Sequence, residues 1–135
     1  ELISGVNGFR LPVEAEWEFA TLGGQNFKYA GSDHLKEVGW YDLWYGTSNV
    51  TPRQTQPIAQ LKPNGYGLYD MTGNVWEWCG DYNDPYQHPL RESLRATRGG
   101  SWDNNADVCE VFCRSAFLPD HRDSIIGLRL CRSLG

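Results

Sequence analysis

Residues 64–82, NGYGLYDMTGNVWEWCGDY, carry the clearest structural signals in this sequence of 135 residues. Two glycines bracket a tight bend near the start, and residues 72–74, Thr-Gly-Asn, predict a second turn. Residues 75–79 then alternate between two faces, as a β-strand does. Glu77 shares its face with an apolar Val and a Cys, so we expect its carboxylate to be buried. A buried carboxylate needs hydrogen-bond donors, an arginine or a metal ion beside it.

The flanking sequence predicts few other regular elements. Residues 9–24, FRLPVEAEWEFATLGG, predict a short helix that ends at a glycine pair and is apolar on two sides, so we expect it to be covered on both. A short strand is expected over 56–61, a helical turn over 68–71, and a final strand over 125–131. Four tryptophans are expected in the core: Trp17, Trp76, Trp78 and Trp102.

The composition favours one loop-rich globular domain and excludes several other classes. The 15 glycines and 7 prolines predict many turns, while 6 tryptophans and 7 tyrosines can supply a core. The net charge is −5 and the basic residues are scattered, which argues against a nucleic-acid partner. No apolar run is long enough for a transmembrane segment.

The cysteines and histidines show no metal-binding spacing. No CxxC pair occurs, and the histidines stand apart from the cysteines, so an ordinary zinc site is not expected. We expect the cysteines to be structural or surface residues, with metal ligands or redox centres as the alternative. The residues concerned are Cys79, Cys109, Cys113 and Cys131, with His34, His88 and His121.

Three motifs together resemble one known family. They are residues 9–24, the stretch PNGYGLYDMTGNVWEWCGDY at 63–82, and RGGSW at 98–102 followed by GLRL at 127–130. They look like the formylglycine-generating-enzyme-type, or sulfatase-modifying, domain. The resemblance implies an α+β class and a loop-rich C-type lectin fold, as a single domain over residues 1–135. The match looks like the C-terminal half to two-thirds of that domain, so we expect the N-terminal part to be lacking.

Two departures from the family's motifs bear on its chemistry. The family's oxidases bind copper with a cysteine pair, and the matching positions here are Asn104 and Cys109, so one thiolate is missing. We therefore expect no enzyme activity and no cofactor, with a formylglycine-generating-type oxidase or related sulfatase-modifying enzyme as the alternative.

Val13 stands where the family usually has a helix-capping Thr, and the missing cap costs about 1 kcal/mol of helix stability. Glu77 resembles part of the family's calcium site, but we favour a structural ion pair.

The C-terminal stretch is similar to a second group with the same fold, the variable proteins of diversity-generating retroelements. In that group a fixed framework surrounds positions mutated from adenine-rich codons, typically Asn codons ending in C. None of the fifteen residues at such positions here is Lys, Gln, Glu, Met or Trp, the types that such codons cannot encode. Glu110 does not fit this rule, and we take it as fixed or outside the set. The resemblance implies a variable, ligand-binding region over residues 103–125. Its expected ligand-binding positions are Asp103, Asn104, Asn105, Asp107, Val108, Phe112, Cys113, Ser115, Ala116, Phe117, Leu118, His121, Asp123, Ser124 and Ile125.

The residue types at these fifteen positions also favour a binding surface. Large apolar residues alternate with acids, and the acids would lack partners in a core. A binding surface accepts apolar anchors with polar neighbours, although apolar residues that seal the core beneath a plain loop are the alternative. We expect a protein or other macromolecular ligand, with a purely structural or carbohydrate-binding lectin-type module as a further alternative. The resemblance implies a bacterial cell surface or a phage tail as the location.

Overall fold

A four-stranded sheet forms the centre of the molecule. The computed structural model describes residues 8–42, 53–82 and 94–133, and the strand order is β4-β3-β2-β5. Strand β3 pairs antiparallel with both β2 and β4, whereas β5 runs parallel to β2. The strands are β2 (Trp76–Tyr82), β3 (Arg95–Arg98), β4 (Arg114–Phe117) and β5 (Ile126–Gly127).

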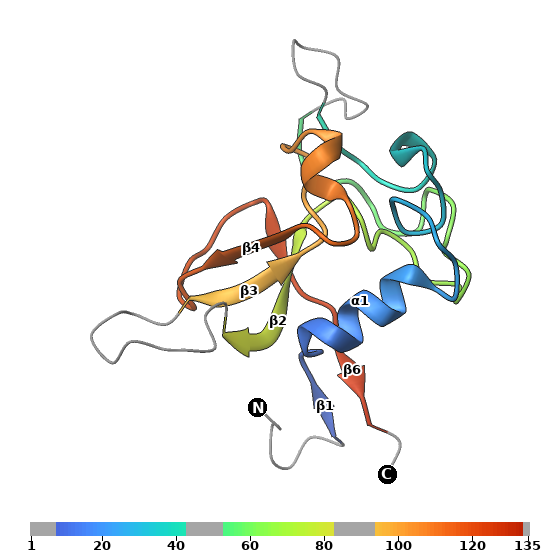
Figure 1. The fold of residues 1–135 in the computed structure, drawn as a ribbon. Helices are drawn as coiled ribbons and strands as arrows, with labels where there is room; N and C mark the ends of the chain where they lie inside the picture. The colour runs from blue at the N-terminus through green and yellow to red at the C-terminus, as the bar shows by residue number, and fades with distance from the viewer. Residues whose placement is uncertain (1–7, 43–52, 83–93, 134–135) are drawn as a thin grey trace.

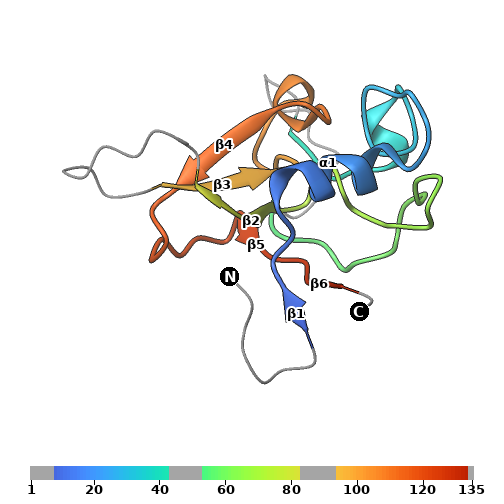
Figure 2. The same ribbon diagram turned by 60° about the horizontal axis from the view of Figure 1, so that its bottom comes forward.

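The remaining elements are short and lie around this sheet. Helix α1 (Glu14–Leu22) lies beside β2 and β3 (Figure 1). A second, two-stranded sheet pairs β1 (Phe9–Arg10) with β6 (Cys131–Arg132), so the two ends of the described chain meet (Figure 2). Two single-turn 3₁₀ helices complete the fold, η1 (Leu35–Glu37) and η2 (Ala106–Cys109).

The predicted helix is confirmed, and the structure shows how it begins without a capping side chain. Val13 has no side-chain acceptor, but the Asp81 carboxylate on β2 accepts the backbone N–H of Glu14 at 2.7 Å. Glu16 reaches back to the Val13 N–H at 3.0 Å, which supplies the second half of a capping box. At the other end, Gly23 takes a left-handed conformation with φ of 60°.

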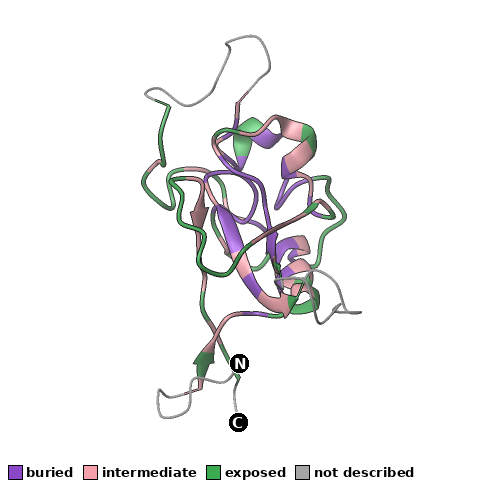
Figure 3. Cartoon of the chain, turned by 90° about the vertical axis from the view of Figure 1, so that its left-hand side faces the viewer, coloured by how far each residue is buried: buried purple, intermediate pink, exposed green. Residues whose placement is uncertain are grey.

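Two clusters of buried side chains form the core, which lies between α1, the sheet and the long loops (Figure 3). Trp17 and Trp76 are buried as expected, but Trp78 and Trp102 are only half-buried. The first cluster contains Trp17, Ala30, Met71, Cys79 and Ala96, and the second contains Tyr29, Leu35, Val38, Tyr41 and Cys109.

Three predictions of local structure were wrong, each for a local reason. Residues 56–61 form no strand, because Ala59 has a φ of +61° and Ile58 is turned out to solvent. Residues 68–71 form no helical turn, because Asp70 has a φ of +56°, outside the right-handed helical region. Helix α1 is not covered on both sides, because Phe19 is 67% exposed although its ring lies tilted beside that of Tyr66, with 5.8 Å between the centroids.

The final strand predicted over 125–131 is interrupted. Its ends form β5 and β6, but Arg129 between them turns inward. Leu128 and Leu130 consequently lie outside, at 62% and 51% exposure. The apolar pattern predicts that the leucines face the core, but the bond of Arg129 to the buried Glu77 carboxylate turns the arginine inward instead.

Candidate ligand-binding surface

The segment 103–125 runs from η2 through β4 to the start of β5. The sequence shows no helix or strand period there, yet β4 forms because it lies antiparallel to β3 along its whole length, and η2 forms with Asn105 as its N-cap. None of the fifteen predicted ligand-binding residues is buried, and eight of them are half-buried. The seven exposed residues are Asp103, Asp107, Phe112, Leu118, His121, Asp123 and Ser124.

Two residues that lie between these positions are buried, whereas other intervening residues are half-buried or exposed. Cys109 and Val111 are both 0% exposed, whereas the adjacent Phe112 is 65% exposed. Both backbone groups of Val111 are held: its N–H donates to the Lys28 carbonyl at 3.0 Å, and its carbonyl accepts from Arg98 Nη1 at 3.0 Å. Fixing Val111 in this way turns the next side chain outward.

An ion-pair network connects this segment to helix α1. Arg98, a buried residue at the end of β3, donates to Glu14 at 2.7 Å and to Glu18 at 2.9 Å. Arg114, the first residue of β4, donates to both carboxylate oxygens of Glu14, at 2.7 and 2.6 Å. Burial would raise the pKa of Glu14, but the hydrogen bonds from Arg114 and Arg98 outweigh it and hold that pKa below its ordinary value. The network therefore fixes both sides of the exposed Phe112 to a rigid helix.

Several half-buried positions among the fifteen also stabilise local structure, which the sequence did not indicate. Asn104 Oδ1 accepts from Ser101 Oγ at 2.7 Å, and Asn105 Oδ1 accepts the Val108 N–H at 3.3 Å and caps η2. Both roles belong to short polar side chains that bond to nearby backbone or hydroxyl groups.

Phe117 forms part of an aromatic stack on the same segment. Its ring lies edge-on to Trp78 at 6.2 Å and nearly parallel to His121 at 5.1 Å. His121 lies 3.5 Å from Asp123, so the stack ends in a polar pair at the surface. This arrangement places an aromatic face beside charged groups, as binding surfaces often do.

The guanidinium of Arg53, which lies outside the segment 103–125, forms an ion pair with a residue of this segment. Arg53 bridges the carboxylates of Asp42 and Asp103 and lies over the Trp102 ring, 5.9 Å from its centroid. Because its position in a loop shows no pattern, the sequence did not indicate Arg53 as part of this surface. Asp42 also donates its backbone N–H to the Asn104 carbonyl at 2.8 Å, which ties the start of the segment to the core loop.

The four cysteines are free thiols, and Cys79 and Cys109 are buried. Burial raises the pKa of Cys109 to about 12, so its thiol is protonated at neutral pH. A copper(I) site requires thiolates, and the position that would supply the second one holds Asn104. Cys79 and Cys109 belong to the two core clusters, and Cys113 and Cys131 are half-buried.

The buried Glu77 is held by an arginine and a tryptophan. Arg129 donates to Oε1 at 2.9 Å and to Oε2 at 3.1 Å, and Trp17 Nε1 donates to Oε2 at 2.9 Å. Burial raises the pKa of Glu77, and the Arg129 guanidinium opposes that rise. The prediction of a structural ion pair is confirmed. Across residues 8–42, 53–82 and 94–133, no three Cys, His, Asp or Glu side chains gather in a way that could hold a metal ion.

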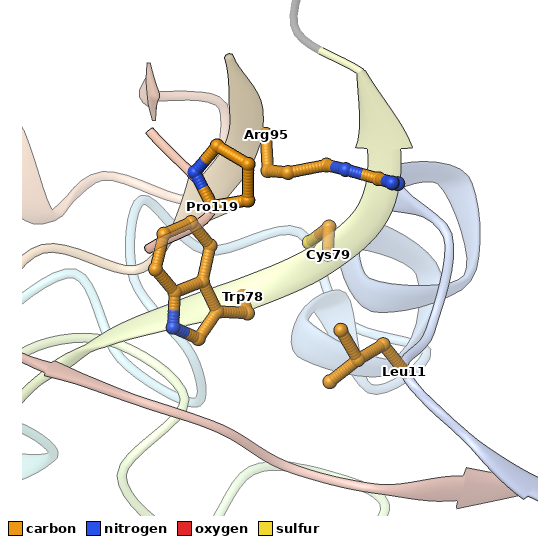
Figure 4. A pocket seen from close by; sticks show the side chains of 5 residues that line it. All are labelled: Leu11, Trp78, Cys79, Arg95 and Pro119. Carbon is orange, nitrogen blue, oxygen red and sulfur yellow. The ribbon is translucent and has the colours of Figure 1, made fainter. Parts of the chain in front are cut away.

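A small apolar hollow lies beside Trp78, which also belongs to the aromatic stack. It has a volume of about 220 Å³ and is lined by Leu11, Trp78, Cys79, Arg95 and Pro119 (Figure 4). None of the fifteen predicted positions lines it. The Arg95 guanidinium is held by the Gly80 carbonyl at 2.9 Å and lies over the Tyr82 ring at 3.9 Å.

The mixed sheet, the loop-rich core and the framework around RGGSW define a sulfatase-modifying type of lectin-like domain. The family model of the Sulfatase-modifying factor enzyme 1-like domain matches residues 3–134, so the chain belongs to this family. The predicted α+β, C-type lectin-like fold class is confirmed.

Three relatives make the position of the chain within the family more specific. The solved structure of Treponema denticola variable protein 1 is 40% identical with a TM-score of 0.79, over 94% of this chain and 49% of that one. Chaperone protein LppX of Paenibacillus barcinonensis is 37% identical over 96% of this chain and 51% of that protein. The formylglycine-generating enzyme of Streptomyces coelicolor is 35% identical over 90% of this chain and 46% of that protein.

These relatives confirm the resemblance both to a variable protein and to the formylglycine-generating enzymes. The chain spans about half the length of the relatives it matches. In the part of the chain that the structure describes, no helix is long and apolar enough to cross a membrane.

Proposed function

We propose that residues 103–125 form a diversified surface that binds a protein or other macromolecular ligand, on a single domain that includes residues 1–135. One observation carries the proposal: none of the fifteen predicted positions is buried, while Cys109 and Val111 between them are 0% exposed. A fold that separates changeable from fixed residues in this way can accept new side chains without losing its core. Its similarity to a variable protein supports the same function.

The chemistry of the exposed positions suits a macromolecular partner. Phe112 and Leu118 offer apolar anchors at 65% and 37% exposure, and acidic residues surround them in the sequence. Apolar anchors with a polar rim are typical of protein interfaces. The ion-pair network through Glu14 holds the segment in one conformation, so little ordering entropy is lost on binding. A bacterial cell surface or phage tail is the location that goes with this proposal.

A pair of displayed libraries tests the surface. The first randomises the fifteen positions with codons ending in C, and the second randomises exposed residues on α1, β1 and the 53–62 loop. Both are selected against the same purified proteins of unrelated folds. We expect most members of the first library to remain folded and to yield binders whose affinity maps to the fifteen positions. Loss of folding in most members of the first library, or equal yields of binders from both, would contradict the proposal.

Oxidase activity of the formylglycine-generating type is the second candidate, since formylglycine-generating enzymes are among the relatives. Of the two positions that match the family's copper-binding cysteine pair, one still holds a cysteine, Cys109. Its thiol is buried and protonated at neutral pH. Copper(I) titration and thiol-dependent oxygen consumption separate the candidates. Oxygen consumption that is lost in Cys109→Ser but kept in Cys113→Ser would show that the protein is an enzyme. That result would contradict the expectation that it has no catalytic activity.

A further inference from the structure

The small hollow beside Trp78 lies at an irregularity in strand β2. Trp78 lies opposite Thr97 on β3. Tyr82, four residues further along β2, lies opposite Arg95, which is only two residues from Thr97. This bulge lets the consecutive side chains of Trp78 and Cys79 line one hollow, although neighbours in a regular strand face opposite sides. Bulges often lie next to functional sites because they redirect side chains in this way.

The size and the walls of the hollow suit a single aromatic ring. Its volume is about 220 Å³, and most of its lining is apolar (Figure 4). An apolar cavity of about 150 Å³ is enough to hold benzene, so this hollow admits one ring with a short substituent. The indole of Trp78 and the ring of Pro119 are both part of the wall, and an aromatic ligand packs favourably against an indole.

Arg95 adds a positive charge to this apolar lining, and its hydrogen-bond partners are neutral. Its Nη1 donates to the Gly80 carbonyl at 2.9 Å, and its Nη2 donates to the Tyr82 hydroxyl at 3.1 Å. Within the part of the chain that the structure describes, Arg95 forms no ion pair with a carboxylate. A guanidinium carries five N–H donors, so further donors remain for an anion.

The same contacts hold the guanidinium of Arg95 in place before any ligand arrives. It lies over the Tyr82 ring, 3.9 Å from the centroid. The Gly80 N–H donates to the Pro12 carbonyl at 2.8 Å, so the residue that accepts from Arg95 is itself fixed. A cation that is already positioned loses little side-chain entropy when it binds an anion.

We propose that the hollow binds a small aromatic carboxylate. The ring would fill the hollow against Trp78, and the carboxylate would accept hydrogen bonds from Arg95, whose planar guanidinium matches a carboxylate. Drug-sized ligands occupy sites of about 300–1,000 Å³, so the hollow is too small for a nucleotide or a fatty acid. None of the fifteen predicted positions lines the hollow, so this inference and the proposed function can fail separately.

Phenylacetate and phenylacetamide test the site, because they have the same ring and arm but only the first is charged. Each is titrated into the protein, and the tryptophan indole signals are followed in nitrogen–proton NMR spectra, with Trp78 assigned from Trp78→Phe. We expect phenylacetate to bind with a Kd of about 1 mM or tighter and to shift the Trp78 signal most. We expect phenylacetamide to bind about tenfold more weakly, because it lacks the charge-assisted bond. Equal affinities, no saturation by phenylacetate, or a largest shift at another tryptophan would overturn the inference.

Two substitutions separate the charge from the shape of the hollow. Arg95→Gln should weaken phenylacetate binding about tenfold and leave phenylacetamide binding within about twofold. Leu11→Phe, which fills the hollow, should weaken both ligands about tenfold. Arg132→Gln is the matched control, because this exposed arginine does not line the hollow, and it should change neither affinity.

The variants can also contradict the inference. Phenylacetate affinity that Arg95→Gln changes no more than Arg132→Gln would overturn it, and so would full affinity for both ligands in Leu11→Phe. If Arg95→Gln does not fold, the comparison of the two ligands on the original protein and on Leu11→Phe still decides.

Discussion

Replacing Arg129 with methionine should destabilise the protein strongly, because it leaves the buried carboxylate of Glu77 without its cationic partner. The side chain of Glu77 is 5% exposed and receives three Arg129 contacts between 2.9 and 3.3 Å. In Arg129→Met the Trp17 indole, at 2.9 Å, would be the one donor left from this set. The Tyr69 carbonyl would also lose its bond to Arg129.

The size of the loss follows from the burial of the two groups. Removing one partner of a buried ion pair costs 3–5 kcal/mol, roughly. The Arg129 side chain is 33% exposed, so water screens part of the attraction and about 3 kcal/mol is expected. That loss is a large fraction of the roughly 5–15 kcal/mol that stabilises a typical domain.

The loss should also depend on pH with a definite sign. Burial raises the folded-state pKa of Glu77 above its ordinary value of 4.5, and Arg129 limits the rise. A raised folded-state pKa means that folding favours the protonated acid, so this contribution to stability falls as pH rises from about 4.5 through the folded-state pKa. Without Arg129 that pKa rises further, so the deficit of Arg129→Met should be larger at pH 8 than at pH 5.

Urea unfolding followed by tryptophan fluorescence at both pH values measures the free energy of unfolding. Arg132→Met is the matched control, because this exposed arginine lies over the Phe9 ring, and its cost should stay within about 0.5 kcal/mol. Glu77→Gln combined with Arg129→Met should recover part of the loss, since no buried charge remains. A loss below about 1 kcal/mol, or one that is independent of pH, would refute the reasoning.

Three further predictions concern the framework and the helix. Phe112→Ser should change the free energy of unfolding by less than about 0.5 kcal/mol, whereas Val111→Ala next to it should cost about 2 kcal/mol; equal costs in thermal melts would show that position 112 is part of the core. Because its pKa is about 12, only about one Cys109 thiol in ten thousand is ionised at pH 8, so Cys109 should resist iodoacetamide while the half-buried Cys113 reacts. Mass spectrometry that finds Cys109 modified first would contradict its burial. Asp81→Ala should cost about 1 kcal/mol by removing the acceptor at the start of α1, and Val13→Thr should gain about 0.5–1 kcal/mol by adding one; urea melts in which neither changes stability would show that the helix end needs no cap.

Much of the fold could be predicted where local chemistry and periodicity agree. The helix from Glu14, its stop at Gly23, and the strand around Glu77 all follow from patterns within about ten residues. The partner of Glu77 was predictable in kind, since a buried carboxylate needs a donor. The choice among the arginines depends on the parallel pairing of β5 with β2, which brings Arg129 to Glu77 across 52 residues of the chain.

The sequence was least informative where one distant contact overrides a local preference. Leu128 and Leu130 look like core residues, yet the inward bonds of Arg129 leave both exposed. Asp81 replaces a missing helix cap from 67 residues away. Arg53 meets Asp103 from a loop without any periodic pattern. The fifteen positions stay a prediction that rests on the framework around them, and the capping role of Asn105 depends on η2, which has no periodic signal.

The DNA that surrounds the gene offers the most direct test of diversification, the central claim here. We predict a near-identical repeat of the segment that encodes residues 98–130, beside a gene for a reverse transcriptase. The two copies should differ at adenines of the repeat, and the differences should fall in codons for the fifteen positions while those for Cys109 and Val111 are spared. A complete flanking sequence with no such repeat, or with differences spread evenly over the buried framework, would contradict the claim.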